Sequence, residues 1–382
     1  MLLCKKAYHN YTLEGMFLEV NEVNEVNAMS EANEVNEVNE VDVMSEANEM
    51  NKANTVKSFT VTALDDNQRL NRYLMKTVPL LSGTLMYRYL RTGHIKVNGK
   101  KIKADYRLKR GDKISLYFSD EFFEVKEEKL GFLNASRILK IIYQDKNIAI
   151  LQKESGLLSH SDISTDDDTL INRFLRHLYE KGEYDPSIVS SFTPALCNRL
   201  DKDTEGLVIA AKTPKALREL NLMIRNQHII KEYLAVVSAK PPKDGIYYAY
   251  LKDNPSAGAK GVVVSDKEDD RSKQIMTGIQ SIYADRNLYV VRVELITGRK
   301  HQIRAHLAHL GCPVLGDVLY GDKQLARKYT VDSQILMSHK VSFSLANHSA
   351  DYPTLKYLDG RSYEIKNAAV SFCRKVDNLS GR

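Results

Sequence analysis

The sequence has few cysteines and lacks any long apolar run, and both absences narrow the class of protein. The four cysteines, Cys4, Cys197, Cys312 and Cys373, are scattered and form no CxxC pair. This spacing argues against a disulfide framework or a cysteine zinc site and favours a reducing compartment. No segment approaches the roughly eighteen apolar residues that a membrane span requires, and the first six residues do not have the pattern of a secretory signal. We therefore expect a cytoplasmic protein that does not bind membranes.

Motifs for nucleotide and metal chemistry are also missing. The chain contains no Walker loop and no GxGxxG, so no cradle for a nucleotide cofactor is predicted. His301, His306 and His309 are close enough in sequence to raise a metal site as an alternative. Their spacing lacks the HExxH pattern and no further cysteine or carboxylate ligand is obvious. We expect neither a cofactor nor a metal.

Charge is distributed unevenly along the 382 residues. Residues 1–56 contain 3 Lys and Arg against 11 Asp and Glu, a net charge of −8. Since the whole chain contains 55 and 49, the remainder holds 52 against 38, a net charge of +14. A basic folded region suits a polyanionic partner. A solvated lysine-rich surface would explain the charge equally well.

Residues 20–54, within this acidic segment, are a low-complexity repeat. Asn-Glu-Val triplets recur, and Met-Ser-Glu-Ala-Asn-Glu occurs at 29–34 and again at 44–49. Asparagine is a poor helix former, and no aromatic or leucine-rich face is present to pack. We predict that residues 1–56 form a disordered acidic leader, either neutral in function or used to bind a partner.

Residues 57–118 have the pattern of a small basic domain. Two helices are predicted, from Gln68 to Lys76 and from the N-cap Ser82 to Arg91, the second ending at Gly93. A hairpin of residues 95–97 and 101–103 around Asn98-Gly99, and a last strand over 113–118, should follow. Six basic residues should crowd one side: Arg88, Arg91, Lys96, Lys100, Lys101 and Lys103. The string LRTGHIKVNGKKIKADYRLKRGDKI resembles the S4-type RNA-binding domain, which implies that these side chains contact RNA.

The rest of the chain alternates short strands and helices. We predict a linker over 119–136, a second domain over 137–376 and a tail over 377–382. Strands are expected at 148–152, 207–211 and 234–237, and the charged segment 252–274 should be rich in loops. Helices should begin after Thr169 and after Thr213, and another should span 301–310.

Three motifs in this second domain carry polar residues beside apolar segments. They are Cys197-Asn-Arg-Leu-Asp-Lys-Asp-Thr-Glu-Gly206, Lys231-Glu-Tyr233, and Thr297-Gly-Arg-Lys-His-Gln-Ile-Arg304, the last continuing to Gly316-Asp317 and Tyr320-Gly321. Asp201 would be presented rigidly just before a buried strand, and Arg304 could reach a buried carboxylate. Each motif alone is also compatible with an ordinary polar loop or core position.

In this order, the three motifs resemble the RluA-type family of pseudouridine synthases over roughly residues 137–350, and the S4-like domain in front resembles the members that act on large-subunit ribosomal RNA. The resemblance implies an α+β fold with a mixed, largely antiparallel central sheet. It also implies that Asp201 is the catalytic aspartate, Arg304 its ion-pair partner, Tyr233 the ring that stacks on the uracil, and Arg199 the residue that displaces the base. Asn198, Glu154 and Glu205 differ from the usual family residues but leave Asp201 in place.

The implied chemistry agrees with the missing cofactor motifs, because uridine isomerisation neither oxidises nor consumes anything. Asp201 could attack the sugar or remove a proton from it, and the sequence leaves both open. A non-catalytic S4-domain RNA-binding protein is the main alternative. A carboxylate-dependent glycoside hydrolase ranks last, because it normally needs two acidic residues at a set separation. We expect a monomer.

Overall fold

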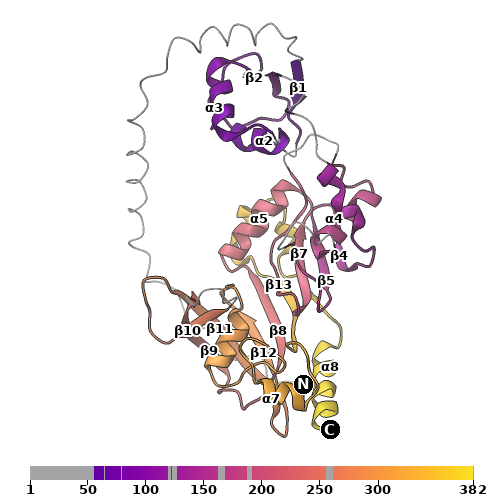
Figure 1. Cartoon of the computed structure of the whole chain (residues 1–382), viewed down its shortest axis with the longest axis vertical. Helices are drawn as coiled ribbons and strands as arrows, with labels where there is room; N and C mark the ends of the chain where they lie inside the picture. Colours follow the sequence, from indigo (N-terminus) through magenta and orange to yellow (C-terminus); the bar gives the residue numbers. More distant parts are fainter. Residues whose placement is uncertain are drawn as a thin grey trace. The chain divides into compact units, whose positions relative to one another are not determined.

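The computed structural model describes residues 56–381, with gaps at 64, 79, 119–121, 123–126, 162–167, 187–191 and 255–260. The predicted acidic leader lies outside the described residues except for Val56, which begins the first strand. The described residues form a three-stranded sheet near the N-terminus and an 11-stranded sheet in the rest of the chain (Figure 1). None of the described helices is long and apolar enough to span a membrane.

The N-terminal unit packs two helices on a small antiparallel sheet of order β1-β3-β2. Ser82 Oγ accepts a hydrogen bond from the Leu85 N–H at 3.3 Å and begins the second helix, and Gly93 ends it in a left-handed conformation with φ +88°. A core of fully buried side chains, including Leu70, Leu74 and Ile114, holds the unit together. Its elements are β1 Val56–Thr60, α2 Leu70–Thr77, α3 Gly83–Thr92, β2 Ile95–Val97 and β3 Lys113–Tyr117.

The predicted hairpin of 95–97 with 101–103 is wrong beyond its turn. Val97 and Lys100 exchange backbone hydrogen bonds at 3.0 Å around Asn98-Gly99, but residues 101–103 form no strand. β2 pairs with β3 instead, and Asn98 exchanges two hydrogen bonds of 2.8 Å with the Lys113 backbone. The turn residue Asn98 therefore bonds to the first residue of β3, and the local sequence pattern could not indicate this pairing.

The large sheet has the order β10-β9-β11-β12-β8-β13-β7-β5-β4, with β6 beside β7 and β14 beside β13. Every pair is antiparallel except β7 with β13. This sheet, flanked by helices, confirms the predicted α+β class. The strands are β4 Lys140–Gln144, β5 Ile148–Lys153, β6 Ala195–Leu196, β7 Glu205–Ala211, β8 Ile229–Val237, β9 Gly245–Asp253, β10 Val262–Ser265, β11 Lys273–Asp285, β12 Leu288–Leu295, β13 Leu336–Phe343 and β14 Ser362–Glu364.

Helices cover both faces of this sheet. α4 Leu170–Glu180 and α6 Gln302–His309 pack on one face, against alternate residues of β7 and β8. α5 Pro214–Arg225 and α8 Ala368–Ser380 pack on the other face, against the residues in between. The remaining elements are α7 Lys323–Lys328 and three 3-10 helices, η2 Glu127–Asn134, η3 Ala346–Asp351 and η4 Lys356–Leu358.

Several predicted boundaries need correction. β8 begins at Ile229, so Tyr233 lies inside the strand and not at its start. The segment 252–274 contains β10, which extends the sheet by pairing with β9. The predicted tail 377–382 is wrong at its beginning, because α8 continues to Ser380 and buries Leu379 in the core. At the end of the predicted linker, Phe132 and Ala135 are buried, and Arg176 Nη1 donates to the Ala135 carbonyl at 2.6 Å.

Candidate active site

Asp201 lies in the loop between β6 and β7, and neighbouring backbone contacts fix this loop. The Ser159 hydroxyl bonds both the carbonyl and the N–H of Leu200, at 2.8 and 3.2 Å. The Thr204 N–H donates to the Asp201 carbonyl at 3.1 Å and closes a turn. The Asp201 side chain remains 30% exposed. A carboxylate held on a rigid turn and still reachable from solvent can act as a nucleophile or as a base.

Gly206 brings this loop against the middle of the sheet. Its φ is +122°, and a Cβ atom there would lie 2.2 Å from the Ser338 carbonyl oxygen, so only glycine fits. Ser338 of β13 pairs with Gly206 on one side and with Tyr233 of β8 on the other. This single stretch of β13 therefore places the Asp201 loop beside the strand that carries Tyr233.

Arg304 of α6 connects two carboxylates. Its Nη1 donates to Asp201 Oδ2 at 2.6 Å, while Nε and Nη2 donate to Asp317 Oδ2 and Oδ1 at 2.6 and 2.9 Å. The Arg304 side chain is 6% exposed. Burial alone would lower the pKa of Arg304, but the hydrogen bonds and charges of Asp317 and Asp201 raise it above its usual value. Arg304 is thus a permanent cation that compensates the charge of Asp201 in a largely dry environment.

Asp317 is the site residue to which sequence reasoning gave no role. Its side chain is completely buried and accepts two more hydrogen bonds, from the Leu319 and Tyr320 N–H groups at 2.9 and 3.1 Å. Burial favours the neutral acid, but the bonds from Arg304 and from these backbone groups hold the pKa of Asp317 below its usual value. The sequence motif included Gly316-Asp317, but nothing in the motif indicated that the Asp317 carboxylate would bind Arg304.

Tyr233 is buried in the core shared by α4, α6 and the sheet, at 4% exposure. Burial raises the pKa of Tyr233 to about 12, and the charge of Asp201 adds to this effect. The phenol is therefore neutral at physiological pH. The electrostatic effect of Asp201 on this phenol indicates that the two side chains lie in the same part of the domain.

Lys153 is a second residue whose role sequence reasoning did not identify. Its side chain is fully buried at the end of β5, and Nζ donates to the carbonyls of Leu157 and Lys202 at 2.6 Å and of Glu154 at 3.0 Å. Burial lowers the pKa of Lys153 to about 8, although the charges of Asp203, Asp201 and Glu205 oppose this shift. Lys153 ties the turn after β5 to the residue that follows Asp201.

Arg199 and three histidines are the other residues of the large domain that the sequence singled out. Arg199 is exposed, and its charge helps to lower the pKa of His160, which burial lowers further. The histidines considered as metal ligands have different partners: Tyr320 for His301, Thr277 for His306 and Asp266 for His309. Within the described ranges, no group of three or more His, Cys, Asp or Glu residues is arranged to hold a metal ion.

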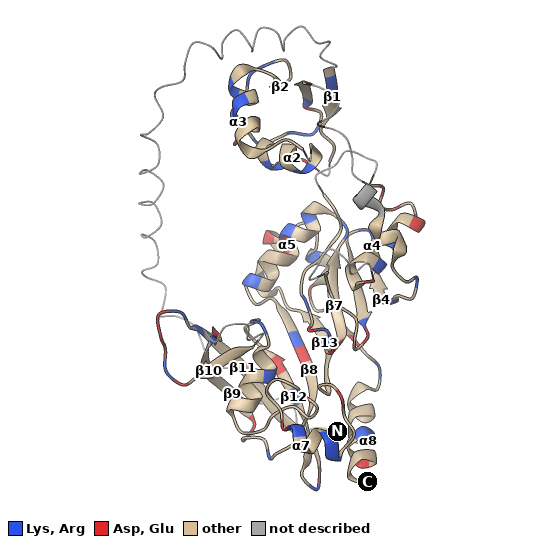
Figure 2. Ribbon diagram, in the orientation of Figure 1, with Lys and Arg blue, Asp and Glu red and all other residues tan. Residues whose placement is uncertain are grey.

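The six basic residues predicted to contact RNA lie on α3, on β2 and in the segment after the Asn98-Gly99 turn (Figure 2). Lys96 Nζ lies 5.0 Å from the centre of the Tyr117 ring. The Lys101 stem packs over Gly93, where a Cβ atom would lie 2.5 Å from Lys101 Cε. Five of the six are exposed: Arg88, Arg91, Lys100, Lys101 and Lys103.

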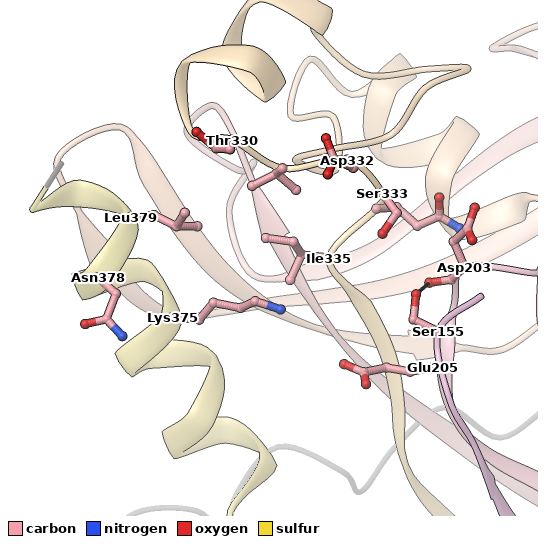
Figure 3. Close-up of a pocket in the computed structure, with 12 residues that line it drawn as sticks. Ser155, Asp203, Glu205, Thr330, Asp332, Ser333, Ile335, Lys375, Asn378 and Leu379 are labelled. Carbon is pink, nitrogen blue, oxygen red and sulfur yellow. Dashed lines mark hydrogen bonds between the residues drawn. The ribbon is translucent and has the colours of Figure 1, made fainter. Parts of the chain in front are cut away.

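A pocket of about 480 Å³ lies between the start of β7, the segment 330–335 and α8 (Figure 3). Three carboxylates line it, from Asp203, Glu205 and Asp332, against the single ammonium of Lys375. Asp201 and Arg304 are not among its lining residues. A phosphodiester would meet net negative charge here, so we do not place RNA in this pocket.

Comparison with known proteins places this geometry in a family. The RNA pseudouridylate synthase family matches residues 147–309, and the S4 domain matches residues 68–114. An uncharacterised RNA pseudouridine synthase of Mycoplasma genitalium is 32% identical over 265 residues, covering 69% of this chain and 81% of that protein. The ribosomal large subunit pseudouridine synthase C of Rickettsia felis is 31% identical over 302 residues, covering 75% and 94%.

Among solved structures, human RNA pseudouridylate synthase domain containing 4 aligns with 20% identity and a TM-score of 0.48, over 67% of this chain and 97% of that one. The sequence relatives are the stronger finding, because they span most of both chains. The resemblance read from the three motifs and from the basic N-terminal segment is confirmed: the chain belongs to the RNA pseudouridine synthases and carries an S4 domain in front of the synthase domain.

Proposed function

We propose that this RNA pseudouridine synthase modifies uridines of large-subunit ribosomal RNA. The observation that carries the catalytic part is the geometry of Arg304, a buried cation that Asp317 holds and that bonds the partly exposed Asp201. The proposed target rests on relatives named ribosomal large subunit pseudouridine synthase C, of which the chain covers up to 95%. We also propose that the protein acts as a monomer in the cytoplasm.

Each site residue has a proposed role in the isomerisation. The reaction breaks the bond between N1 of the uracil and C1′ of the ribose and joins C5 to C1′, while a proton leaves C5 and another binds N1. Asp201 acts on the ribose, and Arg304 holds its carboxylate by a hydrogen bond from a neighbouring positive charge. Tyr233 stacks on the uracil, which offsets part of the few kcal/mol needed to take a base out of its helix. Arg199, exposed beside the loop, displaces the base.

The S4 domain has the proposed role of holding the RNA. Lys and Arg side chains that neutralise phosphates supply affinity without reading sequence. Arg88, Arg91, Lys100, Lys101 and Lys103 are exposed, and Lys96 is half-buried against Tyr117. We assign these six residues to the phosphate contacts.

The alternative, a non-catalytic S4-domain RNA-binding protein, is less favourable on energetic grounds. Burying a guanidinium and a carboxylate costs several kcal/mol, which the pair repays only with good geometry. Arg304 and Asp317 meet that demand with two bonds shorter than 3.0 Å. The third hydrogen bond joins Arg304 to Asp201, an accessible carboxylate. A protein that only binds RNA would not need this bond.

The test combines an enzyme assay with a map of the cell's RNA. The purified protein should release tritium from 5-tritiated uridine in large-subunit ribosomal RNA, whereas Asp201→Asn should release none and bind RNA within a few-fold of the wild type. A pseudouridine map of ribosomal RNA from a strain without the gene should lack specific sites. Tritium release by Asp201→Asn would refute the role of the aspartate, and an unchanged map would refute the proposed target.

A further inference from the structure

His301 is a strained residue at the edge of the active site. It is the N-cap of α6 and has a left-handed backbone, with φ +52° and ψ +16°. Asparagine or glycine would adopt this conformation more easily. The His301 side chain is only 12% exposed, so its ring is turned inward. Strain of this kind persists where the surrounding structure holds the residue in place, often at a functional site.

The hydrogen bonds of the ring favour a proton on one of its two nitrogens. The Val262 N–H donates to the Tyr320 hydroxyl oxygen at 2.8 Å, and the same hydroxyl lies 3.0 Å from His301 Nδ1. A backbone N–H can only donate, so the Tyr320 oxygen is the acceptor there and its own hydrogen is free for Nδ1. Burial lowers the pKa of His301, which favours the neutral ring. We therefore assign the proton of His301 to Nε2.

Nε2 faces the carboxylate of Asp201. It lies 3.8 Å from Asp201 Oδ1, whereas Arg304 Nη1 binds the other oxygen, Oδ2, at 2.6 Å. The two oxygens therefore face different donors, a cation for Oδ2 and a neutral N–H for Oδ1. Oδ1 is the less engaged oxygen and has lone pairs available for the ribose. A movement of under 1 Å would bring Nε2 within hydrogen-bond distance of it.

Tyr320 connects these parts. Its ring packs edge to face with the His301 ring, with 5.8 Å between their centres, and the Arg304 guanidinium carbon lies 5.4 Å from the Tyr320 centre. Tyr320 also follows Asp317, the second partner of Arg304, and its N–H bonds that carboxylate. One tyrosine thus supports both donors that face Asp201.

We propose that His301 is a positioning residue that holds Asp201 Oδ1 toward the ribose, with Tyr320 fixing its tautomer. This inference rests on the proposed function of Asp201. The role is the same whether Asp201 attacks the sugar carbon or removes a sugar proton, since both need an ionised carboxylate in one orientation. Four charged groups act on the ring: Asp201 and Asp317 favour its protonated form, and Arg304 and Lys300 disfavour it.

The experiment compares two substitutions that remove the imidazole. His301→Phe keeps a ring but has no donor, and His301→Gln places an amide N–H near the position of Nε2. If Nε2 moves within hydrogen-bond distance of Oδ1 when the ribose binds, the Phe variant loses a hydrogen bond to a charged group, and single-turnover tritium release should fall about 10- to 100-fold. The Gln variant should recover most of this loss. Recovery in the Gln variant, with the melting temperature of both variants unchanged, would distinguish a positioning donor from a purely structural side chain.

Two further variants complete the design. Tyr320→Phe keeps the ring beside Arg304 and removes only the hydroxyl. Because this hydroxyl fixes the tautomer of His301, the rate should fall by about 3- to 10-fold. His309→Phe, on the same helix but bonded to Asp266, should release tritium like the wild type. RNA affinity should stay within a few-fold in all four.

The outcomes separate this inference from the proposed function. A wild type without tritium release would refute the function itself. An active wild type with a Phe variant of equal rate would overturn the role of His301. Equal losses in the Phe and Gln variants with equal falls in melting temperature would also overturn it, in favour of a purely structural histidine.

Discussion

Replacing Arg304 by lysine tests whether the charge or the shape of this side chain matters. Arginine uses three nitrogens here, two on Asp317 and one on Asp201. A lysine of similar length supplies one nitrogen, which cannot make both pairs in the same geometry. The charge would stay with Asp317, which is fully buried and needs it most. Asp201 would then lose its hydrogen bond.

The expected magnitudes follow from the type of bond that is lost. A hydrogen bond to a charged group contributes about 1.5–3 kcal/mol, so Arg304→Lys should reduce the rate of the chemical step by roughly 10- to 150-fold. Arg304→Leu removes the cation entirely, and breaking a buried pair costs about 3–5 kcal/mol. The leucine variant should therefore lose about two to four orders of magnitude and also unfold at lower temperature, because Asp317 remains buried without its partner.

Single-turnover tritium release at saturating enzyme is the appropriate assay, with thermal unfolding measured in parallel. Arg327 is exposed on α7, and its lysine and leucine variants provide matched controls. A lysine variant at position 304 that equals the wild type would refute the requirement for a fork. A leucine variant with an unchanged rate would refute the pairing of Arg304 with Asp201 altogether.

Three other substitutions probe stability and RNA binding. Lys153→Met should alter the pH dependence of unfolding, because burial lowers the pKa of Lys153 in the folded protein to about 8, below the 10.5 of the free side chain. The unfolding free energy of the wild type relative to this variant should therefore rise by up to about 3 kcal/mol between pH 8 and pH 10.5. A difference that does not change with pH would contradict the burial of a charged lysine. Changing Lys100, Lys101 and Lys103 to Gln should reduce the salt slope of log K for RNA by about 2 to 3 if each contacts one phosphate, and an unchanged slope would place the RNA elsewhere. Thr213 Oγ1 caps α5 by accepting from the Ala216 N–H at 3.2 Å, so Thr213→Ala should lower the free energy of unfolding by about 1 kcal/mol in a denaturant titration, and no change would show that the cap is dispensable.

The sequence predicted well those features that depend on neighbouring residues. Ser82, Thr169 and Thr213 each accept a backbone N–H bond at the start of a helix, because a cap is formed within four residues. The left-handed Gly93 ends α3 for the same local reason. The motifs around Asp201 and Arg304 were recognisable because they occur in a fixed order along the chain.

Features that depend on distant partners were missed. Asp317 belongs to the site only because Arg304, 13 residues earlier, bonds it with two nitrogens and bonds Asp201 with a third. Lys153 directly follows the predicted strand 148–152, but its bond to the Lys202 carbonyl spans 49 residues. The predicted strand at 101–103 was wrong for a similar reason, because β2 pairs with the more distant β3 and not with residues 101–103. Periodicity reports how a segment is buried, and it does not report which segment buries it.

The position of β13 in the sheet has a consequence for biosynthesis. β13 is made after β12 but lies between β7 and β8, so the strands that carry the Asp201 loop and Tyr233 have no common neighbour until residues 336–343 have been translated. A nascent chain stopped after β12 would hold two half-sheets, each with an unpaired edge, and such edges are where other chains add. Catalytic competence should therefore arise late and in one step, when β13 enters and pairs with both.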